Sequence, residues 1–263
     1  MTSLFPNFID TIKNLTETEI AEPQRVAALS LHQDTSNDRR DVKMVYAPFD
    51  HVNSNARIVI VGLTPGKQQA ANSLRAAKQA IISGASSAQA AEQAKVFASF
   101  SGPMRSNLVK LMDSVGLAGV LNIQTTASLW NEDAALVHFT SALRYPVFID
   151  GENWNGSKPD ALRSSCMRHW LEQYTGQELS QLPEAVLVPL GPKVSVMLEH
   201  LAKIGMIKSG QILTGLPHPA GSNAERIKYF LGQKPAHLLS SKTNAVALDT
   251  ARGSIVARVG ALG

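Results

Sequence analysis

The chain has 263 residues, enough for one large α/β domain with a substantial core, and this length does not require two domains. Hydrophobic residues make up 44% and charged residues 17%, which are ordinary globular values and exclude a largely disordered chain. A net charge of +4, from 25 Lys and Arg against 21 Asp and Glu, slightly favours a polyanionic partner. The single cysteine, Cys166, excludes intramolecular disulfides, iron–sulfur clusters and zinc sites built on several thiolates.

The sequence lacks the usual signals of a membrane protein, an exported protein or a metalloenzyme. Its N-terminus has no basic segment followed by an apolar one, and no apolar run approaches the roughly 20 residues that span a bilayer. None of the seven histidines falls in the His-Glu-x-x-His pattern of zinc enzymes. We therefore expect a cytoplasmic monomer with no membrane association, no cofactor and no metal.

Residues 1–55 are predicted to form a helical extension and a loop that pack on the core. Residues 2–26 have a helical pattern, whereas residues 32–42, HQDTSNDRRDV, are polar enough for a loop or a mobile connector. The core domain is expected to span residues 56–263, so that the chain forms a single domain overall.

Apolar runs alternate with helical stretches through the core domain. Strands are predicted at 56–63, 137–146, 184–191 and 211–219, where short apolar runs end in or contain Gly or Pro. Helices are predicted at 67–83, 86–97, 107–115, 161–174 and 192–204, with Gly84 and Ser86 separating the first two. Residues 247–259 are predicted to form a hairpin or an edge strand. The alternation predicts an α/β fold with a mostly parallel sheet, which binds ligands beyond the carboxyl ends of its strands.

The segment GLPHPAGSNAERIKYFLG, residues 215–232, combines a histidine with the start of a helix. Ser222 and Glu225 have the spacing of a capping box, which predicts a helix from Asn223 whose first N–H groups can bind a phosphate. His218 is expected at the mouth of the sheet, where an imidazole can donate a hydrogen bond to an oxygen that gains negative charge. The alternative is that His218 is an ordinary loop histidine.

Four segments, taken in chain order, resemble the motifs of the uracil-DNA glycosylase superfamily. They are GLTPG (62–66), FTSALRYP (139–146), VLVPLGPK (186–193) and LPHPAGSNAERI (216–227), and the resemblance covers about two thirds of the chain. It implies a three-layer α/β/α sandwich with a mostly parallel central sheet. It also implies that Thr64 lies at the position of the attacking water and that His218 stabilises the leaving base.

The resemblance also implies which residues contact the substrate. Phe100, or alternatively Phe97, would stack on the flipped base. The first loop, Gly62, Leu63, Thr64, Pro65 and Gly66, would hold the base and its sugar. The residues expected to contact the DNA backbone are Lys67, Arg144, Lys193, Pro219, Gly221, Ser222, Asn223 and Arg226.

Hydrolysis of an N-glycosidic bond explains why such loops are needed. The reaction develops a cationic sugar and an anionic base, so the site must stabilise both charges and supply water to C1′. Flipping the nucleotide costs a few kcal/mol, which stacking and phosphate contacts offset. Aromatic, basic and glycine-containing loops together meet these requirements.

The first loop departs from the superfamily pattern at the position of the water. Thr64 cannot act as a carboxylate base, and its hydroxyl can only position the water. Asp50 and His51, just before the first predicted strand, are therefore candidate catalytic groups. The alternative is that they belong to a surface loop without a function.

A second departure concerns recognition of the base. Ser141 occupies the place where many relatives have an asparagine that pairs with uracil, and one hydroxyl cannot make the same two hydrogen bonds. Asn155 is the alternative base-reading residue. Residues 67–96 form a longer segment than in small relatives, which can either enlarge the base pocket or only pack on the core. Trp154 is expected to anchor the core or a loop, with stacking on nucleic acid as the alternative.

The sequence therefore predicts a monofunctional DNA glycosylase that removes a flipped-out modified pyrimidine and leaves an abasic site. A bulky modified cytosine such as glucosylated hydroxymethylcytosine, excised in anti-phage defence, suits the altered loops. Uracil excision in base-excision repair is one alternative, and a non-catalytic DNA-binding or damage-sensing module is another. A Rossmann-type nucleotide enzyme is disfavoured, because residues 62–66 lack the Gly-x-Gly-x-x-Gly turn.

Overall fold

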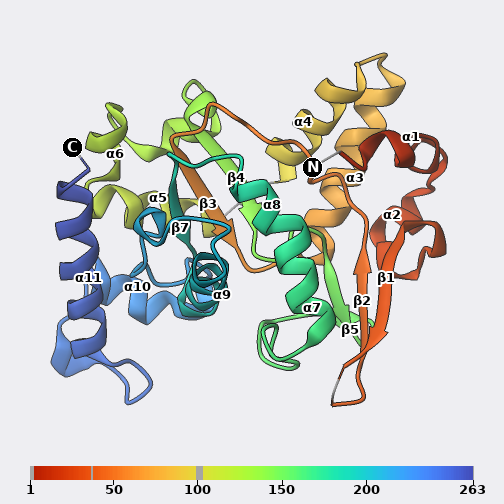
Figure 1. Ribbon diagram of the computed structural model, residues 1–263. Helices are drawn as coiled ribbons and strands as arrows, with labels where there is room; N and C mark the ends of the chain where they lie inside the picture. The colour runs from red at the N-terminus through yellow and green to blue at the C-terminus, as the bar shows by residue number, and fades with distance from the viewer. Residues whose placement is uncertain (1–2, 37, 99–102, 263) are drawn as a thin grey trace.

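The computed structural model describes residues 3–36, 38–98 and 103–262 (Figure 1). Two sheets organise this part of the chain: a parallel sheet of order β4-β3-β7 and an antiparallel sheet of order β1-β2-β5-β6. The parallel strands are β3 (Ile58–Gly62), β4 (Val137–Ser141) and β7 (Val186–Pro189). The protein is thus α/β with a three-stranded parallel sheet, and three of the four predicted strands are confirmed.

The central strand β3 separates two hydrophobic clusters. All five of its residues are buried, as expected for a parallel strand that is covered on both faces. Because side chains alternate along a strand, Val59 and Val61 pack into one cluster, whereas Ile58 and Ile60 pack into the other. The parallel sheet therefore has apolar packing against both of its faces.

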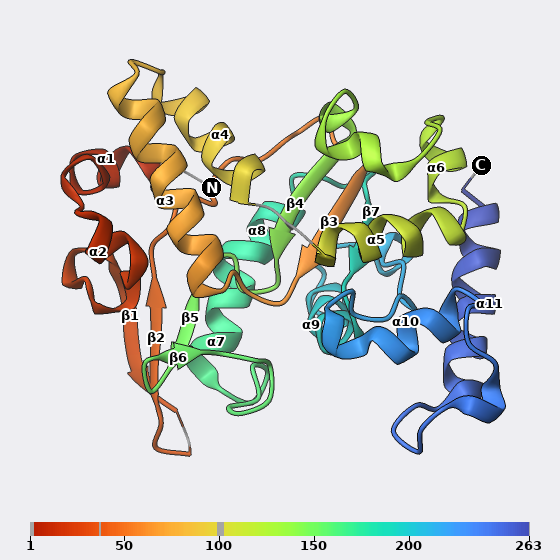
Figure 2. The same cartoon turned by 180° about the vertical axis from the view of Figure 1, so that it is seen from behind.

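Helices lie on both sides of the parallel sheet, as Figure 2 shows from behind. The first cluster includes residues of α3 (Lys67–Ile82), α4 (Ser87–Ala98), α7 (Ser165–Trp170), α8 (Gln177–Leu179) and α9 (Pro192–Lys203). The second includes residues of α5 (Pro103–Ser114), α6 (Leu117–Leu121), α10 (Ala224–Phe230) and α11 (Ala245–Gly260). A π-helical segment, Leu171–Gly176, joins α7 to α8. The predicted helices 67–83, 86–97, 107–115 and 192–204 are confirmed, and that at 161–174 begins later, at α7.

The break between α3 and α4 has the predicted chemistry. Gly84 has a positive φ of 81°, a conformation that glycine adopts at low cost. Ser86 then caps α4: the backbone N–H of Gln89 donates to its hydroxyl, and the Gln89 side chain accepts from the Ser86 backbone.

The predicted loop at 32–42 is wrong, because this segment forms most of a hairpin. Strand β1 (Ser30–Thr35) pairs with β2 (Asp41–Val45), which in turn pairs with β5 (Val147–Ile149) of the core domain; β6 (Glu152–Asn153) completes the sheet. Only one side of β2 is fully buried, at Val42 and Met44, so the polar residues of the hairpin can face solvent. The N-terminal segment also contains the predicted helices, α1 (Phe5–Asn14) and α2 (Glu17–Ala21).

The prediction of a fourth strand at 211–219 is also wrong. Its pairing is limited to a single parallel bridge between Leu187 and Ile212. The chain then passes through Gly215, which has a φ of 129°, and through Pro217 and Pro219, which have no N–H to donate to a neighbouring strand. The segment therefore leaves the sheet as a loop.

The C-terminal segment is helical, so the predicted hairpin or edge strand at 247–259 is wrong. The Asn244 side chain caps α11 by accepting from the Ala247 N–H at 3.0 Å. Ile255 and Val259 are buried in the second cluster, and Arg258 donates to backbone carbonyls of Gly210 and Ile212. The buried side chains, the cap and the contacts of Arg258 together hold this segment as a helix.

The predicted capping box before α10 does not form. Residues Gly221–Asn223 make a short 3-10 turn and α10 begins at Ala224. The Glu225 carboxylate instead accepts hydrogen bonds from Ser240 and Thr243 and pairs with Lys234. These contacts tie the loop after α10 to that helix. No helix in the described part of the chain has the length and apolar character of a membrane span.

Candidate functional site

The carboxyl ends of the parallel strands bring the motif segments to one edge of the sheet. Strand β3 continues into the loop 63–66, and Ser141, at the end of β4, lies opposite Gly62. The loop after β7 contacts the last motif, because a Cβ at Gly191 would lie 3.2 Å from the Cβ of His218. Loops from four separate parts of the chain thus surround one edge, where α/β proteins bind ligands.

His218 is held at this edge as a neutral imidazole. Its ring is half-buried, and its Nδ1 accepts a hydrogen bond from the Ala220 N–H at 3.2 Å. Burial lowers the pKa of His218 below its usual value. An accepting Nδ1 leaves the proton of the neutral ring on Nε2, so His218 can donate one hydrogen bond from that atom.

Two neighbours fix the loop that carries His218. Gly191 has a φ of 95°, which disfavours any side chain, and it allows the loop after β7 to approach His218 closely. The Asn107 side chain of α5 donates to the Pro219 carbonyl at 2.9 Å. Nothing in the local sequence around Asn107 indicates this contact, which joins residues 112 positions apart.

The Thr64 hydroxyl binds the backbone of the turn after β4. It donates to the Tyr145 carbonyl at 3.1 Å and accepts from the Val147 N–H at 3.2 Å. A hydroxyl has one proton and two lone pairs, so one lone pair remains for a further donor. Thr64 thus anchors the first loop, and it can accept a hydrogen bond from a water without removing its proton.

The first backbone N–H groups of α3 donate hydrogen bonds to side chains of the protein. The Lys67 N–H donates to Asn153 Oδ1 at 2.8 Å, and the Gly66 N–H donates to Gln69 Oε1 at 3.2 Å. The Lys67 ammonium pairs with Glu22 at 2.7 Å. Lys67, predicted to contact DNA, is therefore engaged by the N-terminal extension in this conformation.

The segment ENWNG lies beside the first loop, but Asn155 is not its inward-facing residue. Asn155 is exposed, and its Oδ1 accepts from the Ser157 N–H at 3.0 Å. A Cβ at Gly156 would lie 2.8 Å from Leu63 and 2.9 Å from Lys193, so this turn packs between two motif loops. Trp154 is buried and donates to the Pro159 carbonyl, which confirms the predicted role in anchoring a loop.

Comparison with known proteins identifies a relative of this chain. No protein-family model matches the chain, and no solved structure matches it. The uncharacterized protein YoxB of Bacillus subtilis (strain 168) is 33% identical over 206 residues, which make up 78% of each protein. This chain belongs to the YoxB family. The description of YoxB names no activity, so the chemistry of this YoxB-family protein has to be argued from its own residues.

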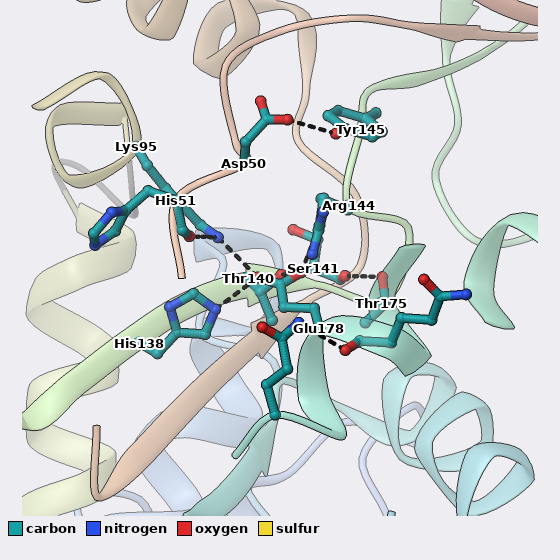
Figure 3. A network of polar contacts seen from close by, with 12 residues as sticks. Asp50, His51, Lys95, His138, Thr140, Ser141, Arg144, Tyr145, Thr175 and Glu178 are labelled. Carbon is teal, nitrogen blue, oxygen red and sulfur yellow. Dashed lines mark hydrogen bonds and ion pairs between the residues drawn. The ribbon is translucent and has the colours of Figure 1, made fainter. Parts of the chain in front are cut away.

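The YoxB-family protein buries a charged network beside the sheet (Figure 3). Both oxygens of Glu178 are occupied: Oε1 accepts from Lys95 at 2.8 Å and His138 at 2.6 Å, and Oε2 accepts from Thr140 at 3.0 Å and Arg144 at 2.6 Å. Burial by itself would raise the pKa of Glu178, but Arg144, Lys95 and His138 outweigh it and hold that pKa well below its usual value. Glu178 is thus a buried anion with a full set of partners.

His138 is neutral within this network. Its Nε2–H donates to Glu178, and its Nδ1 accepts from the Asn53 N–H at 3.3 Å, so both ring nitrogens are used in one tautomer. Burial and the nearby Lys95 lower the pKa of His138 to about 4. No local sequence pattern indicates this network, because its members come from α4, β4, the turn after β4 and α8.

Arg144 was predicted to bind DNA, and the structure corrects this. Its side chain is 3% exposed and is paired with Glu178, so it is inaccessible to a phosphate backbone.

Asp50 is also buried, and it accepts hydrogen bonds from Leu4, Tyr46 and Tyr145. Asp50 and His51 line a cavity together with Arg144, whereas no residue of the motif loops 62–66 or 216–222 lines it. The two candidate catalytic groups are therefore not gathered with His218.

The helical segment 67–96 packs on the core. Alanines of α3 and α4, including Ala77 and Ala94, are buried in the first cluster, and Lys95 joins the Glu178 network. This supports the packing alternative for the segment. The predicted base-stacking residue Phe100 lies outside the described residues, as does the side chain of Phe97.

Several predicted DNA-binding residues remain accessible at the sheet edge. Lys193 is exposed and donates to Ser157 Oγ at 3.2 Å. Arg226 is exposed and donates to Asn223 at 2.8 Å and to the Lys242 carbonyl at 3.0 Å. Gly221 and Ser222 are exposed, whereas Pro219 is buried. Nine of the 25 Lys and Arg but three of the 21 acidic residues follow position 192, so this part of the YoxB-family protein carries +6.

Proposed function

We propose that this protein is a monofunctional DNA glycosylase of the uracil-DNA glycosylase superfamily, a monomeric cytoplasmic enzyme that removes a flipped-out modified pyrimidine. The observation that carries the proposal is the meeting of the four motif segments at one edge of the parallel sheet, with Gly191 against His218. Apolar packing on both faces of that sheet supports the three-layer α/β/α description.

His218 is suited to stabilise a leaving base. When the bond between C1′ and the base breaks, its electron pair stays with the base, and negative charge develops on the base oxygen. The neutral His218 ring carries its proton on Nε2, because Nδ1 accepts from Ala220. It can therefore donate a hydrogen bond to that oxygen while the ring remains neutral.

Thr64 is suited to orient the attacking water. Its hydroxyl proton is donated to Tyr145, and its remaining lone pair can accept a hydrogen bond from water. The water oxygen adds to C1′, and the proton that it loses passes to solvent or to the released base. No carboxylate is required at Thr64 if cleavage of the glycosidic bond precedes the addition of water.

A modified cytosine is the proposed substrate. Ser141 ends β4 opposite Gly62 and is half-buried, so it offers one short hydroxyl at the edge where a flipped base would lie. A small side chain at this place leaves room for a substituted base such as glucosylated hydroxymethylcytosine, in keeping with a role in anti-phage defence. Uracil in base-excision repair is the alternative substrate.

The DNA backbone is proposed to lie along the basic C-terminal part of the chain. Lys193 and Arg226 are exposed beside the His218 loop, and the segment after residue 192 carries +6. Phosphate contacts of this kind release counterions, so binding should weaken steeply as salt is added.

Base excision tests the proposal directly. Purified protein is incubated with duplexes that contain uracil, hydroxymethylcytosine, glucosylated hydroxymethylcytosine or only normal bases, and alkali then reveals abasic sites as strand breaks. Breaks restricted to a modified-cytosine duplex support the proposed substrate, and breaks at uracil support the repair alternative. DNA binding without breaks in any duplex would contradict an enzyme acting on these bases.

A non-catalytic damage sensor is the second candidate. It is favoured by one observation: the Thr64 hydroxyl uses its only proton to hold the first loop, as a purely structural residue would. A sensor would bind a modified duplex more tightly than a normal one without releasing the base, which chromatography of the reaction mixture would detect.

A further inference from the structure

The loop between Leu213 and Ala220 has few backbone hydrogen bonds of its own. The Leu213 N–H donates to a carbonyl of β7, and the next bond between backbone groups in this described part of the chain is accepted by the Ala220 carbonyl. Pro217 and Pro219 cannot donate, because proline has no N–H. The direction of the His218 side chain, which this loop carries, therefore depends on contacts from other elements.

Asn107 of α5 supplies such a contact. Its Nδ2 donates to the carbonyl of Pro219, a buried residue, at 2.9 Å. A buried carbonyl without a partner is unfavourable, and this hydrogen bond removes that cost. Leu108 and Leu111 of the same helix are buried in the second cluster, so the helix that carries the half-buried Asn107 is packed against the core.

The Pro219 carbonyl and the Ala220 N–H belong to one peptide group. The N–H donates to His218 Nδ1 at 3.2 Å, while the carbonyl accepts from Asn107. This peptide bond is trans. A trans peptide group is planar, and its oxygen and its N–H point in opposite directions, so a contact that fixes the oxygen also fixes the direction of the N–H. Hydrogen bonds in such a chain polarise and strengthen one another.

We infer that Asn107 is a positioning residue that sets the tautomer of His218 through the peptide group between Pro219 and Ala220. While the Ala220 N–H is held against Nδ1, the neutral ring keeps its proton on Nε2. Without Asn107 the peptide group can turn away from the ring, and the two nitrogens then share the proton. The effect on catalysis rests on the proposed function, in which the Nε2 proton faces the leaving base, whereas the effect on the ring does not.

Two variants remove the donor. Asn107→Leu keeps the size and branching of the side chain without adding charge, and Asn107→Ala shows whether the leucine itself has an effect. Asn14→Leu is the matched control, because Asn14 Nδ2 also donates to a backbone carbonyl, that of Asp10, at 2.9 Å. Asn14 belongs to α1, which lies on the opposite side of the molecule from α10, the helix that follows the His218 loop (Figure 1).

The tautomer is measured by nitrogen NMR of protein that contains nitrogen-15-labelled histidine, at about pH 8, where histidine is neutral. His218→Ala identifies the His218 signals by their loss. We expect the wild-type protein and Asn14→Leu to show the widely separated Nδ1 and Nε2 shifts of a single tautomer, protonated on Nε2. In both Asn107 variants the two shifts should move toward each other. Unchanged His218 shifts in these variants overturn the inference, since a residue that only satisfies the Pro219 carbonyl would leave the ring as it is.

Base release measures the effect on catalysis separately. In single-turnover reactions Asn107→Leu should slow release at least about tenfold, because a misdirected donor no longer meets the leaving base. The Kd for the duplex should stay within about twofold, since the hydrogen bond to the developing anion is made only as the bond breaks. Normal release from a variant whose tautomers are mixed would overturn the positioning role in catalysis. If the wild-type protein releases no base, the proposed function fails, and the nitrogen shifts still decide whether Asn107 sets the tautomer.

Discussion

The sheet edge around His218 and the Glu178 network use polar groups in opposite ways, although β4 contributes to both. In the network, four donors occupy the two oxygens of Glu178, and the carboxylate is completely buried. At the edge, His218 is half-buried and retains an Nε2 proton for a ligand. The more strongly perturbed pKa values therefore belong to the structural network, and the candidate site is recognised by accessible hydrogen-bonding capacity instead.

Removing the charge of Glu178, at the centre of the network, should lower the free energy of unfolding more than any other change considered. Glu178→Gln keeps the side-chain volume but leaves Lys95 and Arg144 buried without their anion. Breaking a buried ion pair on one side costs about 3–5 kcal/mol, so we expect a loss of this size in the free energy of unfolding measured with urea. Glu199→Gln, at an exposed position of α9, is the control and should change stability by less than about 0.5 kcal/mol. A loss below about 1 kcal/mol at Glu178 would show that the network is not structural.

Removing the imidazole at the edge should affect turnover much more than stability. Loss of one donor to a developing anion typically lowers kcat by about 10²–10³-fold, so we expect His218→Ala to slow the proposed base excision by this factor. The free energy of unfolding of this variant should fall by only about 1 kcal/mol, the contribution of one hydrogen bond. His237→Ala, at an exposed histidine beyond α10, is the matched control. Unchanged single-turnover kinetics in His218→Ala would show that His218 takes no part in the chemical step.

The neutral His138 makes folding sensitive to mild acid. The folded pKa of about 4 lies below the ordinary value of 6.5, so the unfolded chain takes up this proton first as the pH falls. This residue's contribution to the free energy of unfolding should therefore decrease by about 1.4 kcal/mol per pH unit, or about 2 kcal/mol from pH 6.5 to 5. His138→Asn, which cannot titrate, should show a shallower dependence in denaturant titrations across that range. Equal slopes for the two proteins would be inconsistent with a neutral buried His138.

Substitution of Gly191, which lies close to His218, should have the smallest predicted effect on base release. Gly191→Ala places a side chain at a φ of 95° and a Cβ 3.2 Å from that of His218, so we expect a loss of about 1–2 kcal/mol in stability. Displacement of His218 should also lower base release several-fold. Gly119→Ala is the control, because a Cβ there meets no atom within 4 Å. If both variants melt and turn over alike, the contact between the two loops has no role in placing His218.

Elements with local sequence signals could be predicted before the fold was known. Continuous apolar runs fixed β3, β4 and β7, and the Gly84 and Ser86 pair marked the end of α3 and the start of α4. Glycine and proline after the strands also indicated which loops would lie at the carboxyl edge, including those of Thr64 and His218. These features depend on neighbouring residues, so they can be read without knowledge of the fold.

Features that depend on distant partners could not be predicted from local sequence and are visible only in the folded protein. The β1 and β2 hairpin is stabilised by β5, and α11 is held by burial of Ile255 and Val259, so local composition misidentified both. The Glu178 network joins four segments. Within it Arg144, which the sequence predicts to bind DNA, is a buried ion-pair partner of Glu178. Side-chain charge and propensity are local properties, whereas burial and pairing are set by long-range packing, which no short stretch of sequence records.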